Sequence, residues 1–349
     1  MRAAPIPLLL LAYLFAAAAT TSPVAASPLV AQRFIYETAP FPQCHASTIV
    51  QATDGGLVAA WFGGTRESHP DVGIWISRFE QGRWSIPVEV ANGAQPDGTR
   101  HPTYNPVLFQ PAQGPLTLFY KVGSSVWTWW GMRMTSNDGG RTWSRPEPLA
   151  GGIAGPSKNK PLQMPDGTVV AGSETGPRSK PHESLWRLHF LRSEDAGRSW
   201  SMVGGVAHGA VVSALQPTLL PLGGQALLAL GRTRQGRIFE VRSEDAGRTW
   251  GEVRLSELPN SNAGIDAVKL RDGRYLLVYN HSESKRYPLN VAISTDARTW
   301  RMALTLDDAP NTHGYAYPAV IQSRDGLVHI TYTWDRARIR HAIIDPSAL

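Results

Sequence analysis

Ser136 to Trp143 reads SNDGGRTW, and this octet returns three more times along the chain. The other copies are SEDAGRSW at 193–200, SEDAGRTW at 243–250 and STDARTW at 294–300, the last one residue shorter. A degenerate copy that lacks the Asp spans residues 77–84. Self-similarity at an interval of about fifty residues is typical of repeat architectures.

The chemistry of the octet predicts a hairpin staple. Its Ser and Asp side chains can bond backbone amides within a tight turn, and its Gly supplies a positive φ. Its Trp buries a large apolar surface between strands. We therefore expect the repeated aspartates to be structural rather than catalytic. They are Asp138, Asp195, Asp245 and Asp296.

A second repeat alternates with the first, and consists of a turn Gly followed by a strand of alternating apolar residues. Its six copies begin 49 to 58 residues apart, at Gly56, Gly114, Gly167, Gly224, Gly273 and Gly326. Six such units predict an all-β fold, a six-bladed β-propeller with four-stranded antiparallel blades and Asp-box hairpins. A seven-bladed propeller and a β-sandwich are the alternatives.

Composition and the N-terminus agree with an exported all-β protein. Hydrophobic residues make up 42% and charged residues 18%, with 33 Gly, 27 Pro and 12 Trp. Residues 1–26 predict a signal peptide, with an apolar core from Pro7 to Ala19 and small residues before Ser27. We expect residues 27–349 to form one domain, secreted or periplasmic, without a membrane span after signal cleavage.

Several classes of site are not indicated. Cys44 is the only cysteine, so an intramolecular disulfide is impossible, and we expect it to be structural. The net charge of +6 comes from scattered basic residues, unlike a nucleic-acid stripe, and favours an anionic partner such as an acidic glycan. No zinc ligand set or phosphate loop is visible, so we expect no cofactor, and a monomer.

Multiple SxDxGxTW boxes on six blades resemble the sialidase (neuraminidase) superfamily, more narrowly its bacterial BNR repeat-like branch, whose members are identified as exo-α-sialidases. The resemblance covers essentially the whole mature chain. It implies three arginines that bind the substrate carboxylate, an Asp acid/base and a Tyr nucleophile paired with a Glu. Because the boxes belong to the scaffold, activity has to be argued from these residues.

Four positions match that pattern. Asp71, in the segment that begins at Arg66, corresponds to the acid/base, and Arg66 is a candidate for substrate binding. The resemblance assigns the second and third arginines to Arg232 and Arg286. Tyr317 corresponds to the nucleophile more closely than Tyr315. A neutral Tyr suits an anomeric carbon that carries a carboxylate, because an anionic nucleophile would be repelled.

Two positions depart from the pattern. His45 stands where the first arginine is expected, and Ala214 stands where the Glu partner of the Tyr is expected. Glu67 and Glu174 are candidate substitutes for that Glu.

Further polar residues recur one blade apart, where the innermost strands are expected to begin. In a propeller these points surround one mouth of the channel, so the side chains should converge there and suit an acidic sugar. We expect substrate binding by Asn105, Lys158, Lys160, Gln216 and Asp266.

Three functions remain open from the sequence. The first is an exo-glycosidase of sialidase type that removes a terminal acidic sugar with Asp71 and Tyr317. The second is a hydrolase or lyase for uronate- or rhamnose-type glycans, with His45 or Tyr317 as base. The third is a non-catalytic glycan-binding propeller that uses Trp127, Trp129 and Trp130 as stacking platforms.

Overall fold

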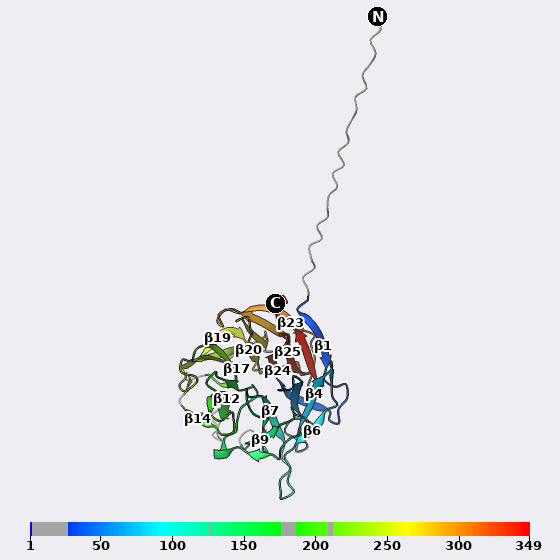
Figure 1. Ribbon diagram of the computed structural model, residues 1–349, viewed down its shortest axis with the longest axis vertical. Coiled ribbons are helices and arrows are strands. Elements are labelled where there is room, and N and C mark those ends of the chain that lie inside the picture. The colour runs from blue at the N-terminus through cyan, green and yellow to red at the C-terminus, as the bar shows by residue number, and fades with distance from the viewer. Residues whose placement is uncertain (2–26, 126–127, 176–185, 205, 209–211) are drawn as a thin grey trace.

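Six β-sheets surround a central axis in the computed structural model (Figure 1). The structure describes residue 1 and residues 27–125, 128–175, 186–204, 206–208 and 212–349, so the expected signal peptide lies outside the described residues apart from Met1. Six blades confirm the propeller prediction and set aside the seven-bladed and sandwich alternatives. Among the described residues, no helix has the length and apolarity needed to cross a bilayer.

The blades follow one another in chain order, and each is given from its innermost strand outward. Blade 1 contains β2 (Gln43–Gln51), β3 (Leu57–Gly64), β4 (Gly73–Glu80) and β5 (Arg83–Trp84), with β6 (Val88–Ala91) also paired to β4. Blade 2 contains β7 (Thr103–Phe109), β8 (Leu116–Val122), β9 (Trp130–Ser136) and β10 (Glu147–Pro148). Blade 3 contains β11 (Leu162–Gln163), β12 (Val169–Thr175), β13 (Arg187–Ser193) and β14 (Ser201–Val203).

The second half of the chain completes the ring. Blade 4 contains β16 (Ala214–Gly223), β17 (Ala226–Thr233), β18 (Arg237–Ser243) and β19 (Glu252–Pro259), and β15 (Ala207–His208) pairs parallel to β19. Blade 5 contains β20 (Asp266–Lys269), β21 (Tyr275–Asn280), β22 (Leu289–Ser294) and β23 (Arg301–Asp307). Blade 6 contains β24 (Tyr315–Gln322), β25 (Val328–Trp334), β26 (Arg338–Ile344) and β1 (Leu29–Phe34). Two short 3₁₀ helices span Ala150–Gly152 and Pro346–Ala348.

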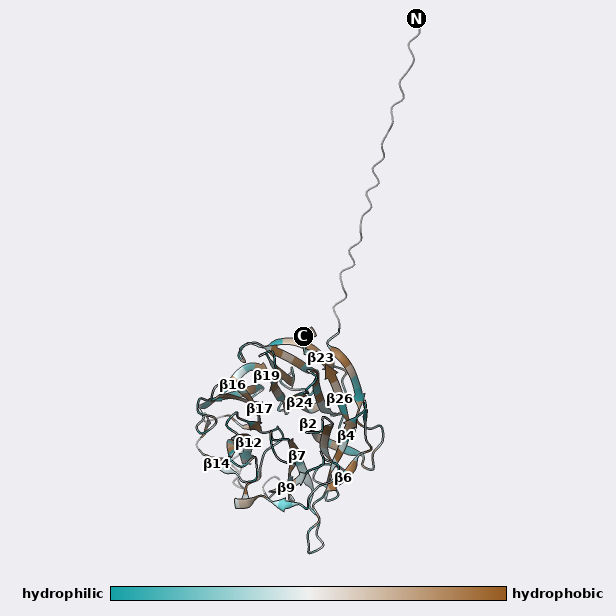
Figure 2. Ribbon diagram, viewed as in Figure 1, coloured by the Kyte–Doolittle hydropathy of each residue, from teal (hydrophilic) through white to brown (hydrophobic). Residues whose placement is uncertain are grey.

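Apolar residues are concentrated on the strands, as the hydropathy colouring shows (Figure 2). Strands β3, β7 and β8 are buried along their whole length, because each blade packs its two faces against its neighbours. Such strands read as continuous apolar runs rather than a half-buried alternation. The core therefore lies between blades, and each blade depends on the next one around the ring.

The Asp boxes form the expected turns. The Asp138 carboxylate accepts bonds from the backbone N–H of Arg141 (3.0 Å) and Thr142 (2.9 Å), and from the Thr142 hydroxyl (2.6 Å). The residue after the box Asp has a positive φ in the shorter copy too, at Ala297 (55°), as at Ala196 (59°) and Ala246 (56°). Hydrogen bonds hold the pKa of Asp195, Asp245 and Asp296 at about 2, although partial burial opposes this for Asp195 and Asp245. The geometry agrees with a structural role for these carboxylates.

The Trp of the box has a wider role than the sequence indicated, because it joins two blades. Trp250 of blade 4 stacks on Phe190 of blade 3, with ring centroids 3.5 Å apart. Trp200 of blade 3 packs edge-on against Phe119 of blade 2 at 5.8 Å. The Trp of the degenerate box also contacts the neighbouring blade, because the Trp84 indole N–H of blade 1 donates to His341 Nδ1 of blade 6 (3.2 Å).

Candidate active site at one mouth of the channel

The innermost part of every blade contains one non-glycine residue with a left-handed backbone. Four of these residues lie in register breaks of the innermost strands, where β2, β7, β16 and β24 pair with their neighbours. The six residues and their φ angles are Ala46 (59°), Asn105 (44°), Lys158 (63°), Gln216 (55°), Asn262 (56°) and Tyr317 (52°). Such conformations are strained, and strain of this kind clusters at functional sites. Four of the six are therefore bulges of innermost strands, whereas Lys158 and Asn262 lie just before β11 and β20.

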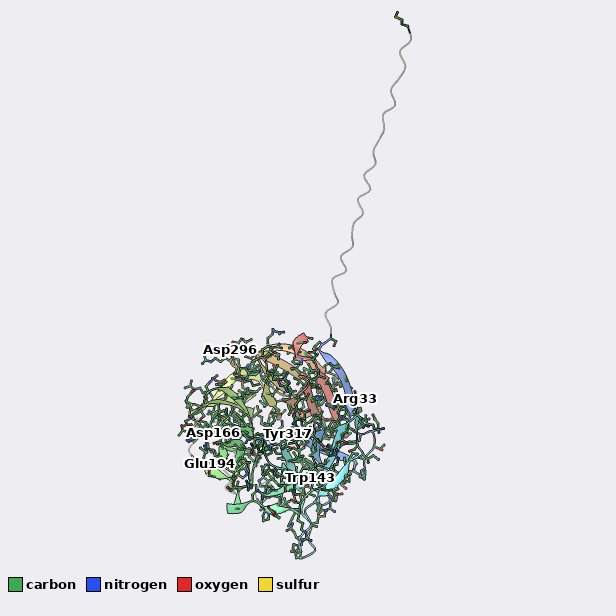
Figure 3. All side chains as sticks on the ribbon, in the orientation of Figure 1. Arg33, Trp143, Asp166, Glu194, Asp296 and Tyr317 are labelled. Carbon is green, nitrogen blue, oxygen red and sulfur yellow. The ribbon has the colours of Figure 1, made fainter. Side chains whose placement is uncertain are left out.

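Tyr317 lies near the middle of the propeller (Figure 3). Its hydroxyl accepts a hydrogen bond from Arg232 Nη1 at 2.6 Å and another from Gln216 Nε2 at 3.1 Å. Arg232 comes from the end of β17, and its Nη1 also donates to Gln216 Oε1 at 3.0 Å. The same guanidinium donates through Nε to Asn262 Oδ1 at 2.9 Å, which adds a residue that the sequence did not single out. A phenol between a guanidinium and an amide is held in one position, and its oxygen lies in a positive field.

Two further guanidinium groups lie near the Tyr317 phenol. Arg286 is on the loop between β21 and β22, and its charge interacts with those of Tyr317, Arg232 and Arg336. Arg336, in the turn between β25 and β26, was missed from the sequence. Its carbonyl accepts from Cys44 N (2.8 Å), which brings it beside His45. Arg336 therefore lies close to Arg286 and His45, and it comes from the last hairpin rather than from the first strand.

His45 is buried beside the Tyr317 ring, with the two ring centroids 4.2 Å apart. Its Nδ1 lies 3.1 Å from Thr333 Oγ1, and its Nε2 has no partner among the described residues. Burial first, and then the neighbouring guanidinium groups, hold the pKa of His45 well below its ordinary value. At neutral pH it is therefore an uncharged imidazole, which can accept a proton but cannot replace the charge of an arginine.

The expected replacements for the missing Glu have other partners. Glu67 Oε2 accepts from Arg336 Nη1 at 2.6 Å, so it orients a candidate carboxylate-binding group. Glu174 Oε1 accepts from the Ser157 hydroxyl at 2.7 Å and lies 3.6 Å from Lys121 Nζ in a separate buried cluster. Ala214 is fully buried. Neither carboxylate is bonded to the Tyr317 hydroxyl.

Asp71 lies on the rim loop of blade 1 and is partly exposed. Its carboxylate accepts from the Thr65 hydroxyl at 2.6 Å and lies 2.7 Å from His69 Nδ1. Partial burial acts to raise the pKa of Asp71, but these contacts outweigh it and hold the pKa below the ordinary value. The free protein therefore favours the ionised carboxylate of Asp71 over the protonated acid that a proton donor needs. Arg66, on the same loop, is exposed.

Three of the predicted binding residues lie beneath the site and are bonded to other groups of the protein: Lys158, Lys160 and Asp266. Lys160 Nζ contacts both carboxylate oxygens of Asp266 (2.9 and 2.8 Å), and the same carboxylate accepts from Thr218 Oγ1 and Val320 N. Lys158 Nζ is buried and donates to oxygens of blades 3, 5 and 6. These contacts occupy the Lys158 ammonium group and the Asp266 carboxylate with protein partners, while substrate binding by these residues stays a prediction.

Asn105 and the tryptophans occupy the side of the mouth formed by blade 2. Asn105 is mostly buried, and its side-chain amide has no hydrogen-bond partner in the described part of the chain. Trp129 packs against Tyr104 (5.5 Å) and over Lys121 Nζ (4.5 Å), so one of its faces is already covered. Trp130 contacts His101, and Trp127 lies outside the described residues. No cluster of three or more His, Cys, Asp or Glu that could hold a metal occurs in the described ranges.

A six-bladed propeller with Asp-box hairpins is the fold of the sialidase superfamily. Within it the chain belongs to the family of the BNR repeat-like domain, whose sequence profile matches residues 55–330. No curated protein matches the sequence significantly.

Solved structures share the fold at low identity. A protein of unknown function from Dyadobacter fermentans has a TM-score of 0.75 and 18% identity, over 90% of this chain and 98% of that one. The Hadza microbial sialidase Hz136 has a TM-score of 0.73 and 18% identity, over 88% of this chain and 66% of that one. The NanB sialidase of Streptococcus pneumoniae has a TM-score of 0.73 and 13% identity, over 93% of this chain and 71% of that one. Similarity at this level of identity shows the fold alone.

Proposed function

We propose that this protein is a glycosidase that releases a terminal, carboxylate-bearing sugar, such as sialic acid, from a glycan. One observation carries the proposal: the Tyr317 hydroxyl is bonded to Arg232 and Gln216 at the mouth of the channel, with Arg286 and Arg336 close by. Guanidinium groups bind carboxylates in a bidentate manner that a lysine cannot reproduce. The solved neighbours that are named as sialidases support the same assignment.

Each residue of the site has a separate role in the proposed reaction. Arg286 and Arg336 would bind the carboxylate, and Tyr317 Oη would attack the anomeric carbon while the glycosidic oxygen departs. Asp71 is the candidate proton donor to that oxygen and the candidate base for the water that later releases the sugar. The phenolic proton must leave as the new bond forms, and the neutral imidazole of His45, beside the Tyr317 ring, is the candidate acceptor.

A uronate lyase is the second candidate, and two observations favour it. No carboxylate in the described part of the chain is bonded to the Tyr317 hydroxyl, and the low pKa of Asp71 leaves that residue ionised at neutral pH. In β-elimination, His45 or Tyr317 would remove the proton next to the carboxyl group, and the arginines would neutralise the carboxylate as charge develops there. The bond to the leaving oxygen then breaks without attack at the anomeric carbon.

We further propose that the protein is exported by its N-terminal signal peptide, acts in the periplasm or outside the cell, and works as a monomer on acidic glycans. The apolar segment Pro7 to Ala19 and the small residues before Ser27 support export. The net charge of +6 supports an anionic substrate.

The test compares two tyrosines of one strand. Tyr317→Phe should lower the kcat for 4-methylumbelliferyl N-acetylneuraminate at least about 10³-fold, because the nucleophile is lost. Tyr315→Phe is the matched control, since the Tyr315 hydroxyl donates to Ala309 O at 2.7 Å and takes no part in the site. The wild type and the control should release methylumbelliferone at similar rates.

Other outcomes separate the candidates. If the wild type leaves the sialoside intact but produces the ultraviolet absorbance of an unsaturated uronate from polyuronates, the lyase replaces the hydrolase. Binding of acidic glycans without any turnover would leave the non-catalytic propeller, and equal activity of wild type and Tyr317→Phe would refute the proposed nucleophile.

A further inference from the structure

Lys158 spans the channel beneath Tyr317. It belongs to the segment before β11 in blade 3, yet its Nζ donates to Ile265 O of blade 5 at 2.7 Å and to Pro318 O of blade 6. The third proton goes to Asn159 Oδ1 at 2.7 Å. An ammonium group has three donors, and here each has an acceptor within the protein. Lys158 is therefore saturated and 2% exposed, so it cannot also hold a substrate carboxylate.

The acceptors of Lys158 are the backbone groups that set the position of the site. Pro318 directly follows Tyr317, whose φ of 52° belongs to the register break of β24. Ile265 follows Gly264, and a Cβ built on Gly264 would lie 3.2 Å from both Lys158 Cε and the Tyr317 ring. The lysine stem, Gly264 and the phenol ring are thus packed together. Movement of the Lys158 side chain would displace the ring.

The neighbouring residue fixes the other half of the arrangement. Asn159 Nδ2 donates to the carbonyl of Gln216 at 3.0 Å, and Gln216 carries a φ of 55° in the register break of β16. Consecutive residues of blade 3 therefore hold the two strained bulges whose side chains meet at the Tyr317 hydroxyl. A left-handed backbone in a non-glycine residue persists only where its surroundings over-determine it.

We infer that Lys158 is a positioning residue, which ties blades 3, 5 and 6 together so that the Tyr317 hydroxyl meets Arg232 and Gln216. This inference rests on the proposed function in assigning Tyr317 to the chemistry. It differs from substrate binding because Lys158 acts through Tyr317. A misplacement of about 1 Å can cost about 10²-fold in rate.

The charge state of Lys158 gives the role a pH dependence. Burial lowers the pKa of Lys158 to about 7. The negative charge of Asp266 opposes this shift, whereas the positive charges of Lys160 and Arg232 add to it. Above that pH the neutral amine offers two N–H groups to three acceptors, so the bond to one carbonyl is lost. The other ionisable neighbours are Tyr317, whose ring centroid lies 5.9 Å from Nζ, and His45, whose charge interacts with that of Lys158. We expect kcat to fall as pH rises through about 7, in a limb that Lys158→Met lacks.

The kinetic test uses 4-methylumbelliferyl N-acetylneuraminate as the probe. Lys158→Met should lower kcat about 10²-fold and leave KM within about threefold, because the arginines that bind the carboxylate are intact. In the Tyr317→Phe background the same change should have no further effect, as expected of a residue that acts through Tyr317. Lys121→Met is the matched control, since it removes an equally buried lysine that bonds to Ser157 outside the site.

Each result then decides the matter. A raised KM with unchanged kcat, additive losses in the double variant, or an equal kcat loss in Lys121→Met would overturn the positioning role. Lys158→Gln, which keeps two donors on a shorter stem, serves if the Met variant does not fold. If the wild type releases no methylumbelliferone, the proposed function fails, and crystal structures of wild type and variant still test the inference. Loss of the bond between Tyr317 Oη and Arg232 Nη1 supports it, and retention of that bond refutes it.

Discussion

At the level of single residues, the site depends on backbone conformations that side chains normally avoid. Asn105, Gln216 and Tyr317 each precede a proline, which disfavours the helical region and ordinarily leaves the preceding residue extended. Each nevertheless has a positive φ. Local rules would have placed these side chains on the face of a regular strand. Contacts from other blades, such as Asn159 to the Gln216 carbonyl (3.0 Å), show why they are not there.

Arg336 provides the residue-scale prediction. Arg336→Met should raise KM for an acidic glycoside about tenfold to a hundredfold, because a charge-assisted hydrogen bond contributes about 1.5–3 kcal/mol. Arg338→Met is the matched control two residues away, since that side chain pairs with Glu37 (2.6 Å) and covers the Phe34 ring at the outer edge of blade 6. Steady-state kinetics of both variants decide the point. Equal KM values for the two would remove Arg336 from the site.

The same residue shows where prediction from sequence ended. Arg232, Arg286 and Tyr317 could be placed because each occupies a position that the family pattern defines relative to a strand. Arg336 could not, because the family pattern places the first arginine on the first strand, where His45 stands. It reaches His45 only through closure of the ring, which joins residues almost 300 positions apart. The bonds from Lys160 to Asp266 and from Lys158 to Ile265 O and Pro318 O join different blades, so they could not be predicted from the sequence.

At the level of elements, the Asp box is both a turn and a contact between blades. The turn could be predicted from the octet, because its hydrogen bonds are local. The contact could not, since Trp250 meets Phe190 sixty residues away. The boxes lie at the opposite end of the strands from the site: Arg141 of the first box bonds to Asp54, in the turn that joins β2 to β3 (2.8 Å). Their loss should therefore affect stability rather than chemistry.

Trp250→Ala tests that separation. Removal of a buried Trp typically costs about 3–5 kcal/mol, and we expect a loss in this range because Trp250 is 9% exposed and stacked on Phe190. Trp300→Ala removes the equivalent, more exposed side chain of the next box and should cost less. Urea unfolding gives both values, and kcat of each folded variant should match the wild type. A fall in kcat without loss of stability would contradict the structural role of the box.

At the level of the whole molecule, two sets of contacts close the ring of blades at blade 6. The first is β1, from the beginning of the described chain, which pairs antiparallel with β26 near its end. The second is a chain of hydrogen bonds from blade 1 into blade 6. The Trp84 indole can only donate, so His341 Nδ1 must accept, and neutral His341 carries its proton on Nε2. That proton is donated to His329 Nδ1 at 3.0 Å.

This hydrogen-bond chain should make closure of the ring sensitive to acid. Burial lowers the pKa of His329 from 6.5 to about 4, so between these values the unfolded chain binds the proton more readily than the folded protein. The stabilisation is complete above about pH 6.5 and is lost as pH falls towards 4. The shift corresponds to roughly 3 kcal/mol. We expect the urea-unfolding free energy of the wild type to fall by up to that amount over this window, and His329→Gln to lose less. His313→Gln, at an exposed histidine, should keep the full wild-type slope. If all three proteins lose stability in parallel, the acid sensitivity belongs to other groups, and the seam between blades 6 and 1 has no special part in it.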